Sequence, residues 1–485
     1  MKAPNVASNF LLAPIAALAL TGCISLAPEH ERPGLPVPPV YPVSATQDGG
    51  EDRDISPLQW RNFFTDPAMQ QLIAAALEHN RDLRKALLRV EEARAAYGIQ
   101  RSERMPDINL GGQGARSRIP ADLSPAGRSI VGSEYRAEVG LTSWELDLWG
   151  RVRSLEQAAL QNWLATEAGG QAVQAALINE VAQAWLNLRE LDQRLAVTRQ
   201  TVASREKSHE IFQRRYAVGA TAKLDVTQVQ TLLTQAQALQ AQLELQRAQQ
   251  INALRILAGD AAPGLLEQSA TGMPQLAPLQ AGLPSELLVN RPDIQAAEHQ
   301  LRAANANIGA ARAAFFPRIA LTGSFGSASA ELDDLFSSGS KAWAFRPSIS
   351  LPIFDGGRRR AGLELSKVRR ELAVTGYEQA IENAFRDVAD ALAARHWLAD
   401  QLQARQVARD AQAERARLAQ LRYDNGSAAY LEVLDAQRDL LDAEQQLIST
   451  ARALSASQVS LYAALGGGAG PLPDNSGRPV SSNSE

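Results

Sequence analysis

The stretch RYAVGATAKLDV at residues 215–226 returns 207 residues later as RYDNGSAAYLEV at residues 422–433, without a gap. Shorter matches precede both copies: PDINL at 106–110 with PRIAL at 317–321, and Gly150-Arg151 with Gly357-Arg358. Each half is therefore expected to repeat one order of elements: a helix, two strands, and two long helices joined by a turn. A single duplication of this length predicts a pseudo-twofold protomer, whereas a solenoid would show periods of about 20–50 residues.

The helices are predicted to be unusually long. Residues 150–216 are 67 residues without a proline, which would extend about 100 Å as one helix. In the last helix, large apolar residues recur at every seventh position beside a row of small residues, the two rows being Val433, Leu440, Leu447, Leu454 and Leu461, and Ala436, Ala443, Thr450, Ser457 and Ala464. Such paired rows favour close, supercoiled packing of helices.

The strands are predicted in neighbouring pairs, near residues 106–117 and 133–146 in the first half and near 317–327 and 342–354 in the second. Apolar and polar residues alternate in them, which fits either a half-buried strand of a soluble sheet or a barrel strand of about 9–11 residues. Four strands cannot close a membrane barrel alone, because the smallest single-chain barrels have about eight. If the strands enter lipid, we expect three chains to pool twelve of them around a water-filled lumen.

The composition excludes several classes of protein. With 45% hydrophobic and 21% charged residues, and a mean hydropathy of -0.21, the chain is too polar for a bundle of membrane-spanning helices. Its net charge of -4 gives no reason to expect nucleic-acid binding. The histidines are scattered and no glycine-rich phosphate loop is present, so we expect no catalytic site, no metal site and no enzymatic activity.

The N-terminus predicts export and a lipid anchor. Residues 1–22 have a basic start and a short apolar run, which is typical of a signal peptide. The tetrad Leu20-Thr21-Gly22-Cys23 ends in the only cysteine of the chain and resembles the bacterial lipoprotein box. That resemblance implies diacylglycerol on the thiol of Cys23 and an acyl chain on its new amino group; no other cofactor is expected. The alternative is an ordinary signal peptide with an incidental cysteine.

The rest of the chain divides by composition. A lipidated tether and equatorial segment is predicted at 23–66, the first structural repeat at 67–258, and an equatorial linker rich in proline and glycine at 259–284. The second repeat follows at 285–465, and a tail rich in glycine, proline and serine at 466–485.

Together these features resemble the outer-membrane efflux protein family, the TolC-like channels, and within it the lipoprotein branch typified by OprM. The most specific parts are the duplicated Arg-Tyr-x-x-Gly-x-x-x-x-Leu-[Asp/Glu]-Val segments, Trp144 to Arg151, and Leu351 to Arg358. The resemblance implies a mainly α fold with a membrane β-barrel part: a trimer whose twelve-stranded barrel continues into a long periplasmic α-helical barrel. The implied partners are two further copies, outer-membrane lipid, a periplasmic adaptor (membrane fusion) protein and an inner-membrane pump of the RND type, with no nucleic acid.

The resemblance also assigns roles to the duplicated turns. The expected adaptor-contacting tips are Arg215, Tyr216, Gly219, Arg422 and Gly426. The expected periplasmic gate joins a tyrosine at the position of Tyr423 to an aspartate at the position of Asp225. Two further acidic residues, Glu432 and Asp435, would face the lumen as rings and attract cations. This chain has Ala428 where TolC has an arginine, so one bond of that gate is missing, and Arg422 is a candidate substitute.

The function expected from these features is a passive exit duct of a tripartite efflux pump, carrying drugs and other small molecules from the periplasm to the exterior. Two alternatives remain at the level of sequence. One is the same duct serving protein or peptide secretion, or metal export. The other is a lipid-anchored coiled-coil scaffold without a pore, which would leave the four strands unexplained.

Overall fold

The computed structural model describes residues 26–41, 59–259, 264–267, 272–279 and 286–472. The predicted signal peptide and Cys23 lie outside these residues, as does the tail beyond residue 472. The chain forms two compact units, one of residues 1–33, 91–166 and 297–377, the other of residues 34–90, 167–296 and 378–485. The helices α5 (Arg151–Ala217) and α9 (Arg358–Asp424) contribute residues to both units.

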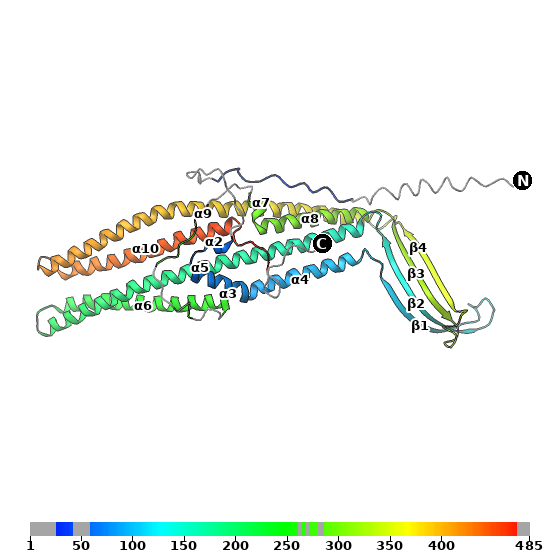
Figure 1. Cartoon of the computed structure of the whole chain (residues 1–485), viewed down its shortest axis with the longest axis horizontal. Coiled ribbons are helices and arrows are strands. Elements are labelled where there is room, and N and C mark those ends of the chain that lie inside the picture. Colours follow the sequence, from blue (N-terminus) through cyan, green and yellow to red (C-terminus); the bar gives the residue numbers. More distant parts are fainter. Residues whose placement is uncertain (1–25, 42–58, 260–263, 268–271, 280–285, 473–485) are drawn as a thin grey trace. The chain divides into compact units, whose positions relative to one another are not determined.

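The first unit contains one antiparallel sheet in the order β1-β2-β3-β4, with the strands Ile108–Ile119, Ile130–Leu146, Arg318–Ser329 and Lys341–Ser350 (Figure 1). The last strand ends at Ser350 rather than near 354, because its partner β3 begins at Arg318, opposite Ser350, and offers no residue to pair with those that follow. Between Leu141 and Trp144 the register of β2 against β3 shifts. Ser143 has a φ of 49° at this bulge, a backbone conformation that only the surrounding pairing can hold in a non-glycine residue.

The two faces of this sheet differ sharply in chemistry. Residues that pair across the strands share a face, and one face carries Ile108, Leu110, Val139, Leu141, Ile319, Leu321, Phe325, Trp343, Phe345 and Ile349. The other face carries small and polar residues, among them Asn109, Gln113, Glu138, Ser324, Thr322, Arg346 and Ser348. Leu110 and Trp343 leave 84% and 76% of their surface exposed in the single chain. The sheet is therefore amphipathic, with an apolar face that no other part of the described chain covers.

Equivalent turns connect the sheet to the two longest helices, α5 (Arg151–Ala217) and α9 (Arg358–Asp424). Gly150 and Gly357 have φ angles of 69° and 90°, which an L-residue adopts only with strain. The Asp147 carboxylate then accepts from the N–H groups of Val152 and Arg153 in the first turn of α5, and Asp355 accepts from those of Gly357 and Arg359 where α9 begins. Aspartate here satisfies donors that have no partner within the helix. The sheet-proximal parts of α4 (Arg81–Ser102) and α8 (Pro292–Ala313) complete the first unit.

The second unit is helical. It contains α2 (Trp60–Phe63), α3 (Pro67–His79), α6 (Lys223–Ala258), α7 (Leu287–Asn290) and α10 (Tyr430–Ala464), with the remaining lengths of α5 and α9. The pairs α5/α6 and α9/α10 are hairpins (Figure 1). Among the described residues, no helix is both long enough and apolar enough to cross a membrane.

The core of the second unit lies where the short helices meet the hairpins. Phe63 and Phe64 are fully buried, and the Phe63 ring stacks on Tyr462 with 4.4 Å between centroids. A single β-bridge joins Phe64 to Leu276, which ties part of the predicted equatorial linker to α2. In α10 the row of small residues is the more buried one: Ala436, Thr450, Ser457 and Ala464 are buried, whereas Leu440, Leu447 and Leu454 keep part of their surface.

Candidate functional site at the hairpin ends

Both hairpins end in the same turn. Gly219 and Gly426 have φ angles of 74° and 71°. The N–H of Ala220 donates to the carbonyl of Arg215 at 2.8 Å, and the N–H of Ser427 donates to that of Arg422 at 2.9 Å. This is the bonding of a Schellman motif, in which a glycine at positive φ lets the last helical carbonyls find donors. The duplicated sequence is therefore a duplicated helix-ending turn.

An aromatic cluster joins the two hairpin ends. The ring of Phe212 on α5 lies 4.4 Å from the ring of Tyr430 on α10, and Tyr430 lies 4.8 Å from Tyr423 on α9. Buried Val226, Val229 and Leu434 pack beside Phe212. Burial raises the pKa of Tyr430 above its ordinary value, and its hydroxyl donates to Ser208 Oγ at 2.9 Å. The hairpin ends thus contact through apolar rings backed by hydrogen bonds.

A polar bond crosses the same contact. Arg215 on α5 donates through Nη1 to the hydroxyl of Tyr423 on α9. Its guanidinium also lies 5.6 Å from the centroid of the Phe212 ring, within reach of a cation–π attraction. Arg215 therefore connects the two halves of the duplication at the tips.

The expected bond between Tyr423 and Asp225 does not form within one chain. The Asp225 carboxylate instead accepts from Thr221 Oγ1 at 2.7 Å and from the N–H of Ala222 at 3.2 Å. An acidic residue at the third helical position suits this role, because the N–H groups of the first turn have no helical acceptor. Asp225 caps the start of α6, and Tyr423 has Arg215 as its partner.

The two acidic residues predicted to face a lumen lie one turn apart near the start of α10. Glu432 accepts from Arg422 Nη1, and Asp435 lies 3.3 Å from Arg438. Their side chains are 40% and 42% exposed. Arg422 thus binds within its own hairpin. It supplies a positive charge there, which Ala428 cannot do.

The remaining tip residues are mostly exposed. Tyr216 keeps 46% of its surface, and the Lys223 ammonium lies 5.3 Å from its ring centroid. Val218 and Leu224 are 79% and 65% exposed. The end of the first hairpin therefore offers apolar surface next to its turn.

Two residues of this contact, Phe212 and Tyr430, were not singled out from the sequence. The signal was present as a difference between the repeats. At the repeat distance of 207 residues, Phe212 corresponds to Ala419 and Tyr430 to Lys223. At these two positions only the copies that contact each other have aromatic side chains. Positions where the two repeats differ therefore indicate this contact better than positions where they agree.

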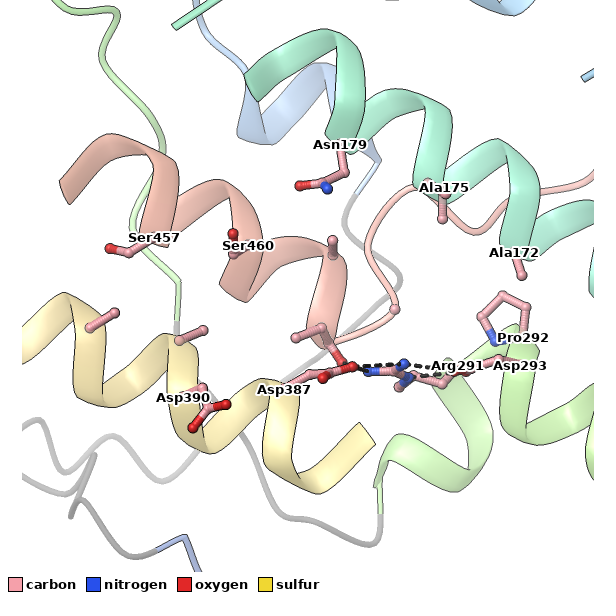
Figure 2. Close-up of a pocket in the computed structure, with 16 residues that line it drawn as sticks. Ala172, Ala175, Asn179, Arg291, Pro292, Asp293, Asp387, Asp390, Ser457 and Ser460 are labelled. Carbon is pink, nitrogen blue, oxygen red and sulfur yellow. Dashed lines mark hydrogen bonds and ion pairs between the residues drawn. The ribbon is translucent and has the colours of Figure 1, made fainter. Parts of the chain in front are cut away.

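A second feature of this unit is a cleft of about 610 Å³ between α5, α9 and α10, near the start of α8 (Figure 2). Arg291 on its wall binds Asp293, Asp387 at 3.3 Å and the carbonyl of Ala464 at 3.1 Å. Burial alone would lower the pKa of Arg291, but the two carboxylates outweigh it and raise that pKa. The guanidinium thereby fastens the end of α10 to α8 and α9, which is a structural role. Among the described residues, no group of three or more His, Cys, Asp or Glu side chains could hold a metal ion.

Comparison with known proteins places this architecture. The model of the family described as Outer membrane efflux protein matches residues 72–260 and 283–467, which takes in both hairpins and the whole sheet. The chain belongs to this outer membrane efflux protein family. SrpC of Pseudomonas putida, a solvent efflux pump outer membrane protein, is 46% identical over 465 residues, covering 95% of this chain and 98% of SrpC.

Solved structures agree with the sequence comparison. A membrane protein from Pseudomonas aeruginosa superimposes with a TM-score of 0.87 at 45% identity, covering 92% of this chain and 98% of the other. The open state of the MtrE outer membrane channel of Neisseria gonorrhoeae gives a TM-score of 0.82 at 38% identity, covering 92% and 98%. The chain is thus an outer-membrane component of an efflux system, with a TolC-like fold and a long periplasmic helical part.

Proposed function

We propose that three copies of this chain form one duct, whose sheets close a twelve-stranded barrel in the outer membrane and whose hairpins form a periplasmic α-helical barrel. The observation that carries the proposal is the four-stranded sheet, with one apolar face, one polar face and two open edges. In lipid every backbone group needs a partner within protein, so such edges must meet those of other chains. The polar face would then line a water-filled passage.

The duct would be passive and would act with two partners. Exposed apolar residues beside the duplicated turns, Val218 and Leu224 above all, offer a surface for a periplasmic adaptor protein. An inner-membrane pump of the RND type would supply the energy. Because relatives are named for solvent and antibiotic efflux, the proposed cargo is small and largely apolar molecules. Lipid on Cys23 would anchor the chain to the same membrane.

The closed state would be held by the contact between the hairpin ends. Opening the periplasmic end requires the hairpins to move apart, and the bond from Arg215 to Tyr423 joins them. This bond is exposed to solvent, so each copy would contribute about 0.5–1.5 kcal/mol, and the trimer would hold three. Losing this bond should therefore favour the open state.

The test is single-channel conductance of the purified protein in planar bilayers. Tyr423→Phe and Arg215→Gln should each raise conductance or open probability. Tyr216→Phe is the matched control, because Tyr216 is the equivalent tyrosine of the first repeat and its ring lies against Lys223 of its own hairpin. Wild-type conductance in all three variants would place the closure elsewhere. Absence of conductance in every variant would favour a scaffold without a pore.

A further inference from the structure

Three basic residues lie on the apolar face of the sheet, all toward its loop end. Arg116 and Arg118 stand near the end of β1, opposite Ser133 and Val131 of β2. Lys341 is the first residue of β4, opposite Ser327 of β3. Strand alternation puts all three on the face that carries Leu110, Val139, Phe325 and Trp343. No acidic residue of the four strands shares that face.

The opposite face carries charges of both signs. It carries Glu134 and Glu138 together with Arg136, and the guanidinium of Arg136 forms an ion pair with Glu134. By contrast, Arg116, Arg118 and Lys341 form no ion pair with any residue in the described part of the chain. Their charges are therefore exposed, of one sign, and directed away from the polar face.

The depth of the two arginines along their strand is also defined. Arg116 lies six positions after Leu110, which is about 20 Å of strand. The apolar band of outer-membrane barrels is about 25 Å tall. The side chains of this face are apolar near the helices and basic near the loops. The change from one to the other occurs over the thickness of a membrane's hydrocarbon layer. Because the helices are periplasmic, the basic end lies at the outer leaflet.

We propose that Arg116, Arg118 and Lys341 bind the phosphate groups of an anionic lipid of the outer leaflet. Arginine suits this ligand because its planar guanidinium donates two parallel hydrogen bonds to phosphate oxygens, and lysine adds a compact charge. Arg116 and Arg118 point the same way two residues apart, about 7 Å along the strand, so both can reach one headgroup.

Lys341 joins the two arginines only if the sheets close into a barrel. The site formed by all three residues therefore rests on the proposed function. β1 and β4 are the two edges of the sheet, so closing the barrel brings β4 of one chain beside β1 of the next. Each of the three seams then carries Lys341 from one chain and Arg116 and Arg118 from its neighbour. A lipid bound there would contact both chains of the seam.

The test uses the full-length protein in phosphatidylcholine nanodiscs, titrated with bis-phosphorylated lipid A and followed by native mass spectrometry. An exposed Lys or Arg near an anionic surface contributes about a fivefold change in affinity. R116Q/R118Q should therefore weaken binding about 25-fold, and adding K341Q should weaken it about fivefold more. The control R136Q/R346Q removes two cations from the polar face and should leave binding unchanged.

Two further measurements make the outcomes separable. Dephosphorylated lipid A should bind the wild type no more tightly than bis-phosphorylated lipid A binds the triple variant. Equal binding of both lipids, or equal binding by wild type and triple variant, would overturn the proposal. So would a triple variant with a weakened trimer and unchanged lipid binding, because the cations would then pair with acidic residues of the neighbouring chain. Conductance of the Tyr423→Phe variant is recorded alongside: tight lipid binding without conductance in that variant would uphold the site of the two arginines and count against the duct.

Discussion

Arg215 and Arg422 occupy equivalent places in the duplication and have different partners. Arg422 binds Glu432 within its own hairpin, whereas Arg215 reaches across to Tyr423. The equivalent of Glu432 is Asp225, whose shorter side chain turns back to Thr221 and Ala222. One methylene fewer thus leaves Arg215 without an acidic partner in its hairpin and available to the other one.

The acidic residues of α10 are predicted to set the cation selectivity of the channel. Glu432→Gln with Asp435→Asn should lower the cation selectivity of the channel, measured as a shift of the reversal potential in a salt gradient toward zero. Rings of carboxylates raise the local cation concentration, and neutral amides of the same shape do not. Asp225→Asn is the control at the equivalent position and should leave selectivity unchanged. A larger shift for Asp225→Asn than for the α10 pair would reverse this assignment.

The glycines of the two turns give the second prediction. Gly219→Val and Gly426→Val should each destabilise the hairpin end by about 1–2 kcal/mol, because a left-handed backbone brings Cβ close to the following carbonyl. Faster amide hydrogen exchange in residues 211–226 or 418–433 would report it. Gly376→Ala is the control: this glycine lies inside α9 with open space around its Cα, so alanine should slow local exchange instead. Unchanged exchange in both Val variants would contradict the prediction.

At the scale of elements, the order of helices and strands could be read from the sequence, and the contacts between them could not. The run without proline predicted α5 well, because nothing within those residues interrupts the hydrogen bonds of a helix. The bulge at Ser143 could not be foreseen, because only pairing with β3 holds its φ of 49°. The partner of Tyr423 was missed for the same reason, since Arg215 lies 208 residues away.

Buried charges tie α5 to α6 and give the third prediction. Asp192 Oδ1 accepts from Arg247 Nε at 2.7 Å, and Arg189 lies 3.0 Å from Oδ2, with only 2% of the Arg189 and Asp192 side chains exposed. Asp192→Ala should lower stability by about 3–5 kcal/mol, because it removes the buried carboxylate that both guanidinium groups bind. Glu210→Ala removes an exposed ion pair with Arg214 on the same helix and should cost less than about 1 kcal/mol. Denaturant midpoints of the two variants compare them, and equal midpoints would count against the network.

The N-terminal segment gives the fourth prediction, which concerns pH. Glu298 on α8 is buried, and burial alone would raise its pKa, but hydrogen bonds from Arg32 and Arg302 outweigh it and hold that pKa below 4.5. His30 lies on the same carboxylate at 3.4 Å. A carboxyl with a depressed folded pKa stabilises the fold above its ordinary pKa, and that stability is lost as the pH falls through the folded value.

Residues 26–33 should accordingly detach from α8 on acidification below pH 4.5. Limited proteolysis with an acid-active protease, or hydrogen exchange across a pH series, would follow the release. Glu298→Gln should detach the segment at neutral pH and remove the pH dependence. A release that follows the same pH course in Glu298→Gln would show that another group controls it.

In the whole molecule, the two open sheet edges need strands to pair with. Cysteines placed on these edges can identify those strands. Cys23 is the only cysteine in the chain and is predicted to be blocked by lipid, so cysteines introduced on the strands would be the only free thiols. Ser117→Cys on β1, combined in turn with Ala342→Cys, Ala344→Cys or Ser348→Cys on β4, should form a disulfide between chains in at least one combination. Neighbouring strands bring facing Cβ atoms within about 5 Å, close to disulfide geometry.

Denaturing gels should then show dimers and trimers and nothing larger, because a closed ring of three has no free edge. Ser117→Cys with Ser324→Cys is the control, since β3 is an interior strand and should yield no cross-link. A ladder beyond the trimer would mean an open sheet, and a cross-link confined to the monomer would mean that one chain closes upon itself.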